Sequence, residues 1–343
     1  MHEILNVLYV QTQGAVLHLD SDTVRVEVEN QTKLQAPLLR LSGLVVFGQV
    51  TVTPFLIHRC ATEGRSLVWL SRSGRFMARL DGPTHGNVLL RRAQHLALND
   101  PKRVVAVACQ FVAAKIHNSR HILMRAARED APPTNAQTLS EAATHLATIL
   151  RRLPGITDLN ELRGAEGEAA RAYFEAFGSM VRQNKEDFAI DGRTRRPPRD
   201  PTNCVLSFLY ALLRSECAAA LEAVGLDPQV GYLHALRPGR PALALDLMEE
   251  FRPVLADRLA LTLVNRQQLT AGDFETLPDG AIRLTENGRK TVITAYQKRK
   301  EAEIRHRVLK QPVPLGLTPH VQARLLARHL RDELEVYPPF LYR

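Results

Sequence analysis

The stretch that decides the fold of most of this chain is Glu161-Leu-Arg-Gly-Ala-Glu-Gly-Glu-Ala-Ala-Arg-Ala-Tyr-Phe174. Its spacing predicts a helix with Glu166 on the same face as Ala169, Tyr173 and Phe177. That face is otherwise small or apolar, and a carboxylate there is costly unless it is paired, hydrogen-bonded or bound to a metal. The stretch therefore predicts a helix packed in a core, with a compensated charge on its buried side.

Two glycines, Gly164 and Gly167, flank this carboxylate. Each weakens a helix by about 1 kcal/mol relative to alanine, which favours the close approach of another backbone or of a ligand. A purely structural interpretation is a buried Glu166 paired with Arg163 or Arg171. The stretch by itself supports both interpretations equally.

The composition is that of a globular protein with room for more than one domain: 343 residues, 45% hydrophobic and 24% charged. The formal net charge of +9 favours a polyanionic partner, nucleic acid first. Four cysteines without CxxC spacing predict neither a zinc site nor a disulfide framework, so reduced thiols of the cytoplasm are expected. We see no secretory signal and no run near the ~18 apolar residues of a membrane span.

The pattern changes character near residue 85, which predicts an α+β protein of two domains. Residues 1–85 form a small mixed β domain with one helix, and 86–343 a larger all-α domain. The breaker-rich segment 81–86 is the expected linker. Strands are expected at 5–10, 15–19, 23–29, 44–47, 67–70 and 75–80, with a helix from Pro54 to about Gly64. Helices are expected at 100–127, 137–152, 158–182, 203–224, 242–265, 288–306 and 317–333.

A second informative region runs from His234 through a basic loop into a helix that carries Asp246 and Glu249. These acids lie at i and i+3 on one face, in line with small apolar residues. A lone histidine is more often structural than a ligand, but one histidine with two or three carboxylates suits Mn²⁺ or Mg²⁺. The sequence therefore makes this region a candidate metal site for phosphodiester chemistry.

A third region, Arg193-Thr-Arg-Arg-Pro-Pro-Arg-Asp-Pro-Thr-Asn203, has four arginines in seven residues, and its prolines prevent a helix. Arginine forks match phosphate oxygens; the alternative is a solvated linker. Asn203 is expected to cap the next helix. The residues expected to contact DNA are all arginines: Arg195, Arg196, Arg199, Arg237, Arg240 and Arg252.

Together these motifs resemble the CRISPR-associated integrase family, the adaptation endonucleases that insert new spacers into CRISPR arrays. The matching segments are 162–167, 195–203, His234 with 245–253, and the closing Tyr-Pro-Pro-Phe-Leu-Tyr-Arg of 337–343. The resemblance covers essentially the whole chain and is greatest to the subtype I-C branch.

This resemblance implies a β domain used for homodimerisation and a helical catalytic domain. It implies that Glu166, His234 and Glu249 hold Mg²⁺ or Mn²⁺. Some members carry Asp where this chain has Glu249, so the longer arm could alter the metal distance. Asp246 matches a nearby acid that either supports the first ligands or holds a second metal. Two dimers are expected to bracket a dimer of a small ferredoxin-like protein, giving a heterohexamer.

The implied activity is metal-dependent DNA integration and cleavage in the prokaryotic cytoplasm, in which a 3′-hydroxyl attacks a phosphodiester. Two alternatives stay open. The chain could be a non-catalytic DNA-binding scaffold whose acids form only ion pairs, or a phosphodiesterase acting on other nucleic acids, RNA included. The preference for DNA comes from the resemblance, since the residues themselves favour neither sugar.

Overall fold

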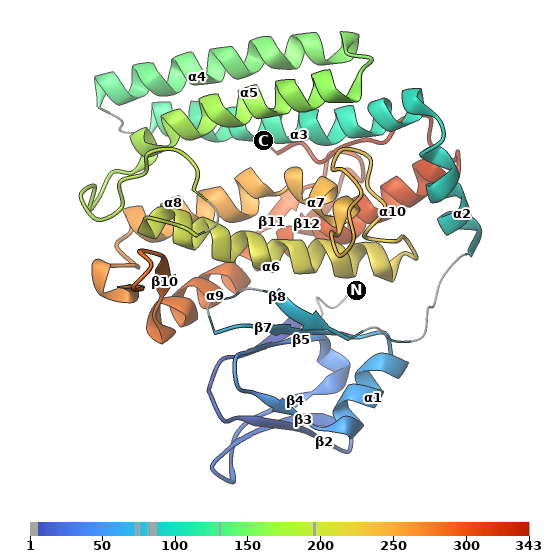
Figure 1. The fold of residues 1–343 in the computed structure, drawn as a ribbon, viewed down its shortest axis with the longest axis vertical. Coiled ribbons are helices and arrows are strands. Elements are labelled where there is room, and N and C mark those ends of the chain that lie inside the picture. Colours follow the sequence, from blue (N-terminus) through green and yellow to red (C-terminus); the bar gives the residue numbers. More distant parts are fainter. Residues whose placement is uncertain are drawn as a thin grey trace. The chain divides into compact units, whose positions relative to one another are not determined.

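The computed structural model describes residues 6–72, 74, 76–80, 82, 88–129, 132–194 and 197–342. It divides the chain into two compact units, Met1–Gly86 and Asn87–Arg343. The first is built on β-strands and the second is mostly helical (Figure 1), so the predicted α+β class is confirmed. Apart from Gly82, the expected linker 81–86 lies outside the described residues.

The N-terminal unit contains two four-stranded sheets. The first has the order β1 (Asn6–Val10), β5 (Leu41–Phe47), β7 (Ser66–Leu70) and β8 (Phe76–Arg79). Its central strand β5 runs parallel to both β1 and β7. The apolar run 44–47 on β5 is buried throughout, as expected of a strand covered on both faces.

The second sheet has the order β4 (Gln31–Pro37), β3 (Thr23–Val28), β2 (Val16–Asp20) and β6 (Thr51–Val52). Strand β4 was not predicted, because its residues are polar and mostly exposed and show no apolar alternation. It pairs with β3 across Glu29 and Asn30, which both have positive φ, the backbone of a tight hairpin turn.

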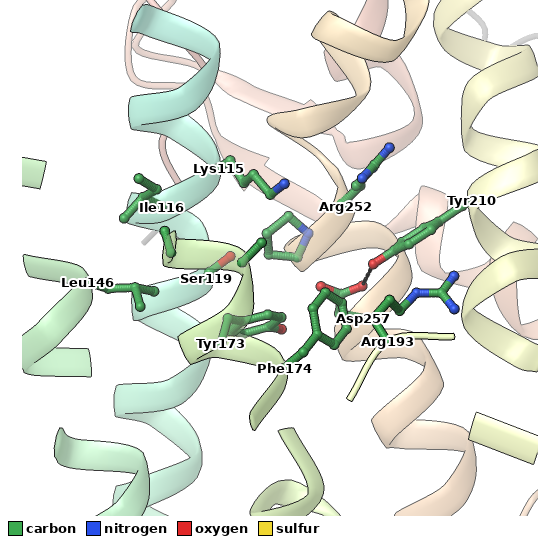
Figure 2. Close-up of a pocket in the computed structure, with 13 residues that line it drawn as sticks. Lys115, Ile116, Ser119, Leu146, Tyr173, Phe174, Arg193, Tyr210, Arg252 and Asp257 are labelled. Carbon is green, nitrogen blue, oxygen red and sulfur yellow. Dashed lines mark hydrogen bonds between the residues drawn. The ribbon is translucent and has the colours of Figure 1, made fainter. Parts of the chain in front are cut away.

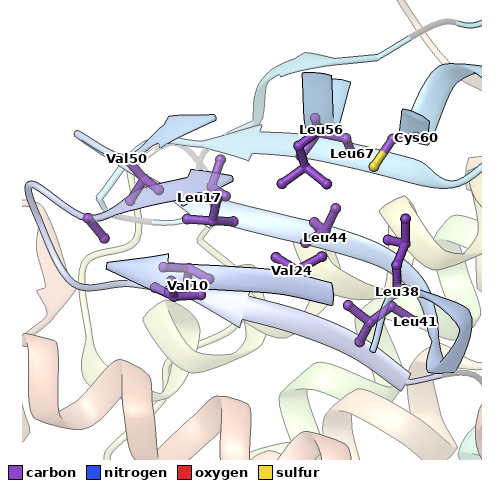
Figure 3. Packing of buried hydrophobic residues seen from close by; sticks show 13 residues of the cluster. Val10, Leu17, Val24, Leu38, Leu41, Leu44, Val50, Leu56, Cys60 and Leu67 are labelled. Carbon is purple, nitrogen blue, oxygen red and sulfur yellow. The ribbon is translucent and has the colours of Figure 1, made fainter. Parts of the chain in front are cut away.

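The core of this unit lies among the strands and α1 (Pro54–Thr62) (Figure 3). Leu17, Leu44, Leu56 and Leu67 are fully buried in it. Helix α1 begins after Thr53, as predicted, but the Thr53 side chain makes no capping hydrogen bond.

The C-terminal unit contains nine α-helices within the described residues. They are α2 (Val88–Ala97), α3 (Pro101–Arg128), α4 (Pro133–Arg152), α5 (Leu159–Phe177), α6 (Pro201–Ala223), α7 (Ala242–Glu249), α8 (Arg258–Asn265), α9 (Glu286–Glu301) and α10 (Thr318–Leu330). Short 3₁₀ turns occur in both units: η1 (Leu38–Arg40), η2 (Leu153–Gly155), η3 (Gly178–Met180), η5 (Ala271–Asp273) and η6 (Leu315–Leu317). Helices α3, α4 and α5 are neighbours, and α6 contacts α7 and α10 (Figure 1).

Three predicted helices are wrong in extent. The helix expected at 158–182 ends at Phe177, where the turn η3 follows. The helix expected at 242–265 is interrupted: α7 ends at Glu249, and a π-helical turn, η4 (Arg252–Asp257), leads into α8. Pro253 lies in that turn and has no N–H for a regular α-helical bond. The helix expected at 288–306 ends at Glu301, where β11 (Glu303–Arg305) begins.

Short strands interrupt the helical unit at two places. Strand β11 pairs with β12 (Pro312–Pro314), and β9 (Phe274–Thr276) pairs with β10 (Ile282–Leu284), both antiparallel. Each strand has three residues, too few for alternation to be recognised in a sequence.

Helix α6 is long and apolar enough, by length and composition alone, to cross a membrane, with a mean hydropathy of 1.5 in its most apolar window. Its Arg214 and Glu216 interrupt the uncharged apolar run that was sought in the sequence. Of that window, 56% is buried inside the protein. Packing in a protein core therefore explains the apolar composition equally well.

Candidate active site

Three separate elements of the C-terminal unit bring charged side chains to one point. Helix α3 supplies Lys115, α5 supplies Glu166 and α7 supplies Glu249. The Lys115 ammonium contacts a Glu166 carboxylate oxygen and lies 2.7 Å from Glu249 Oε2. His234, from the loop before α7, places Nε2 3.9 Å from Glu249 Oε1. The three residues that the sequence singled out, 166, 234 and 249, therefore lie together.

Asp246 builds the loop that carries His234. Its Oδ2 accepts hydrogen bonds from the backbone N–H groups of Tyr232 (2.6 Å) and Leu233 (3.0 Å). Its Oδ1 accepts from the His234 N–H (2.9 Å) and is 2.6 Å from His234 Nδ1. Each oxygen thus has two partners and no lone pair for a metal. Two roles were expected for Asp246: support of the first ligands, or binding of a second metal. This geometry favours support of His234.

The same contacts select the tautomer of His234. A carboxylate can only accept, so Nδ1 carries a proton, and Nε2 is the ring nitrogen on the Glu249 side that is left for a metal. Carboxylate–histidine pairs of this kind orient metal-binding imidazoles in many proteins. The histidine is therefore held in the form that a metal requires.

Two further contacts fix the His234 loop. A Cβ at Gly231 would lie 2.6 Å from the Ala242 carbonyl carbon and 2.7 Å from Asp246 Oδ2, so only glycine fits. Arg163 Nε donates to the Leu233 carbonyl at 2.8 Å, tying the loop to α5. The suggested pairing of Glu166 with Arg163 or Arg171 is therefore wrong, because the partner of Glu166 is Lys115 from a distant helix.

The electrostatics favour full ionisation of this cluster. Glu249 is only 2% exposed, and Arg252 Nη1 lies 3.1 Å from its Oε1. Burial raises the pKa of Glu249, but Arg252, Lys115 and His234 outweigh it and lower that pKa to about 2. Burial lowers the pKa of Lys115, yet Glu249 and Glu166 raise it above its usual value.

A small cavity of about 20 Å³ adjoins this cluster, enough for roughly one water molecule. Figure 2 shows Lys115, Tyr173, Tyr210 and Asp257 around it. The Tyr210 hydroxyl donates to Asp257 Oδ1 at 2.6 Å, and the Arg252 guanidinium lies 4.9 Å from the Tyr210 ring centroid. Burial raises the pKa of Asp257 to about 6, although the hydrogen bond from Tyr210 opposes this rise.

The glycines beside Glu166 have no other backbone packed against them. A Cβ at Gly164 or Gly167 would meet no atom within 4 Å, so the expected approach of another backbone is wrong, and the approach of a ligand stays a prediction. Glu166 itself is half-buried at 26% side-chain exposure. The described residues thus leave open space along this side of α5, while Tyr173 on the adjoining face is buried.

The arginines expected to contact DNA have different surroundings. Arg195 and Arg196 lie outside the described residues. Arg199 is exposed, with one bond to the Asp279 carbonyl at 3.2 Å. Arg237 is exposed and Arg240 half-buried in the loop before α7. Arg252 differs from them, being paired with Glu249 and 14% exposed.

The cap of α6 is Asp200 rather than Asn203, which corrects the prediction. Asp200 accepts the Asn203 N–H at 2.7 Å, and Pro201 occupies the first helical position, where its missing N–H is not needed. Asn203 is buried in the first turn and accepts from Arg193 Nη1 at 2.6 Å. It therefore anchors the arginine-rich segment to α6.

Comparison with known proteins places the chain in a family. The family model described as CRISPR associated protein Cas1 matches residues 8–298. The chain belongs to the Cas1 family. CRISPR-associated endonuclease Cas1 1 of Moorella thermoacetica is 53% identical over 343 residues, covering 100% of both chains. CRISPR-associated endonuclease Cas1 2 of Rhodospirillum rubrum is 49% identical over 347 residues, also covering 100% of both.

Solved structures share the fold. A casposase bound to its integration product superposes with a TM-score of 0.84 at 21% identity, over 98% of this chain and 94% of that one. A Cas1 protein from Thermotoga maritima gives a TM-score of 0.81 at 23% identity, over 97% and 98%. A β-stranded unit followed by a mostly helical one is therefore the architecture of solved Cas1 structures.

Glu166, His234 and Glu249 offer the donor atoms that suit a hard divalent cation. In this structure the Lys115 ammonium lies between the two carboxylates. Within the described ranges, no three acidic, histidine or cysteine side chains already stand in positions to share one ion. Glu166, Glu249 and His234 nevertheless supply two carboxylates and one available imidazole nitrogen. The 3.9 Å between His234 Nε2 and Glu249 Oε1 is within the span of about 4.2 Å for ligands on opposite sides of Mg²⁺.

Sequence reasoning missed Lys115, Tyr210 and Asp257. For Lys115 a signal was present: it follows Ala108 and Val112 at helical spacing, on the buried stripe of α3. A charge on an apolar face identified Glu166, and the same test applied to α3 would have identified Lys115. Asp257 carries the same signal, because Val254, Ala260 and Leu261 lie at helical spacing from it and are apolar. Tyr210 carries none, since a tyrosine on an apolar helix face is ordinary core packing.

Proposed function

We propose that this chain is a divalent-metal-dependent DNA endonuclease and integrase that inserts captured DNA fragments into a CRISPR array. The observation that supports the proposal is that Glu166, His234 and Glu249 meet from distant segments: Lys115 bridges the two carboxylates, and His234 Nε2 faces the other oxygen of Glu249. The relatives from Moorella and Rhodospirillum, which align over their whole length, are named CRISPR-associated endonucleases.

In the reaction, the 3′-hydroxyl oxygen of the fragment forms a new bond to a repeat phosphorus. The bond from that phosphorus to the 3′-oxygen of the repeat strand breaks; the attacking hydroxyl loses a proton and the leaving oxygen gains one. Mg²⁺ or Mn²⁺, held by Glu166, His234 and Glu249, would supply Lewis-acid stabilisation of the phosphodiester under attack.

The chain's own residues contribute orientation and charge. Asp246 holds His234 in the tautomer with Nε2 free. Arg252 is a buried cation next to Glu249, placed to meet a phosphate oxygen. The exposed arginines Arg199 and Arg237, with Arg240, Arg195 and Arg196, would bind the DNA backbone, so that binding weakens steeply with salt.

The experiment replaces Glu166 or Glu249 with alanine in a DNA-joining assay with Mn²⁺. Both variants should lose at least about a hundredfold in rate. Glu175→Ala is the matched control, because Glu175 is an exposed acid on the same helix and its loss should leave the rate unchanged. Undiminished joining by a folded Glu166→Ala protein would overturn the metal-site assignment.

A non-catalytic scaffold remains the second candidate, favoured by one observation. Lys115 and Arg252 already neutralise both carboxylates, so the cluster forms a complete ion-pair network. A scaffold would bind DNA with EDTA present and show no metal-dependent rise in melting temperature. Comparing DNA and RNA substrates separates the integrase from a phosphodiesterase acting on other nucleic acids.

For assembly, we propose a homodimer through the β unit, which exposes Leu39 and Phe55 at 75% and 78%. A solved complex named Cas6-RT-Cas1–Cas2 contains a chain that this one matches with a TM-score of 0.82 at 24% identity, covering 36% of it. We further propose that the homodimer binds a small ferredoxin-like partner and forms a heterohexamer with it. Light scattering with and without that partner tests this assembly. We also propose that the chain belongs to subtype I-C and acts in the cytoplasm.

A further inference from the structure

Lys115 stands where the proposed function requires a different cation. Its side chain is 9% exposed, and its ammonium contacts Glu166 and lies 2.7 Å from Glu249 Oε2. These are two of the three side chains assigned above as metal ligands. An ammonium at that distance occupies the space between the two carboxylates, so a divalent ion cannot share them while Lys115 stays in place.

We infer that Lys115 is an exchangeable internal cation, which closes the Glu166–Glu249 pair when no metal is bound and leaves it when metal enters. This inference rests on the proposed function, because it takes those carboxylates as ligands. Without Lys115, two carboxylates would face each other in a largely buried site, which is costly. The lysine therefore stabilises the carboxylate pair, and a metal must compete with it.

The charges of the site show what the exchange would do. Glu166 and Glu249 carry two negative charges, which Lys115 and Arg252 cancel. Asp246, bonded to His234 Nδ1, adds a third negative charge beside a neutral imidazole. Entry of a divalent cation therefore changes the net charge of these groups from −1 to +1. The loaded site therefore attracts an anion, and a DNA phosphodiester supplies that charge.

Space for the displaced side chain exists within the protein. Lys115 also lines the cavity of about 20 Å³ that contains Asp257 and Tyr210 (Figure 2). The cavity has about the volume of one ammonium head group, and Asp257 there offers a carboxylate, although Arg193 and Arg252 also line it. Metal and DNA would then bind cooperatively, because each favours the arrangement with Lys115 withdrawn.

The test compares Lys115→Met with the wild type by calorimetric titration of Mn²⁺ into the full chain without DNA. The variant should bind Mn²⁺ at least about tenfold more tightly, since a competing charge is gone. Without metal it should melt at a lower temperature, and Mn²⁺ should raise that temperature more than in the wild type. Lys102→Met, an exposed position on the same helix, makes the same charge change and should alter neither quantity.

Mn²⁺ affinity in Lys115→Met equal to or weaker than that of the wild type would overturn the inference. If that variant fails to fold, Lys115→Gln keeps a polar head group and should show the same tightening. Glu166→Ala separates this outcome from failure of the proposed function. If it leaves Mn²⁺ binding unchanged, the metal site itself is wrong; if it abolishes binding while Lys115→Met has no effect, only the exchange is wrong.

Discussion

Replacing Asp246 with asparagine should be among the most damaging isosteric changes in this protein. Each Asp246 oxygen accepts two hydrogen bonds, three in all from backbone N–H groups and one from His234 Nδ1. In asparagine one oxygen becomes an NH₂ group. If it faces Tyr232 and Leu233, two buried N–H groups lose their acceptor. If it faces His234, the imidazole can change tautomer and accept at Nδ1, so that one backbone N–H loses its acceptor and Nε2 becomes protonated.

The magnitude follows from that count. A buried donor left unpaired costs about 1–3 kcal/mol, so Asp246→Asn should lower the free energy of unfolding by about 1–3 kcal/mol in the cheaper amide orientation. Proteins are commonly stable by only about 5–15 kcal/mol. A loss of this size would therefore release the His234 loop, or unfold the chain at moderate temperature.

The assay is equilibrium unfolding in urea at pH 7 without metal, followed by titration with Mn²⁺. Asp227→Asn is the control, because Asp227 accepts one exposed backbone bond, from Gln229, and should cost less than about 0.5 kcal/mol. Mn²⁺ affinity should fall about 10- to 100-fold in Asp246→Asn, as for other partners of ligating histidines. An unfolding free energy within about 0.5 kcal/mol of the wild type would refute the anchoring role.

Three further predictions rest on single contacts. Gly231→Ala should cost about 1–3 kcal/mol in urea unfolding, because the new Cβ meets Ala242 and Asp246; an unchanged midpoint would contradict this. The raised pKa of Asp257, about 6, means that its contribution to stability is complete below pH ~4 and is lost as the pH rises through 6. The free energy of unfolding should therefore change less between pH 4 and 7 in Asp257→Asn than in the wild type, by on the order of 3 kcal/mol. An unaltered pH dependence would show that Asp257 is not the group responsible. Asp200→Ala should lower the free energy of unfolding by about 1 kcal/mol, because it removes the α6 cap. Asn203 is not the cap, so Asn203→Ala leaves the capping bond of Asp200 in place.

The sequence by itself determined the class of fold and most of the elements. Apolar residues at a period near 3.6 predicted α3 to α6, and the buried run 44–47 predicted β5. Charges on apolar stripes drew attention to Glu166 and Glu249. These properties are local, because the period of a helix or strand decides which side chains share a face.

Tertiary structure decided which groups meet. Lys115 and Glu166 are 51 residues apart, and no spacing rule joins two helices across that distance. The four bonds of Asp246 depend on a loop folding back over α7, and the π-helical turn after Glu249 depends on packing around Pro253. A periodic pattern shows that a charge is buried, but only the assembled fold supplies the partner that neutralises it.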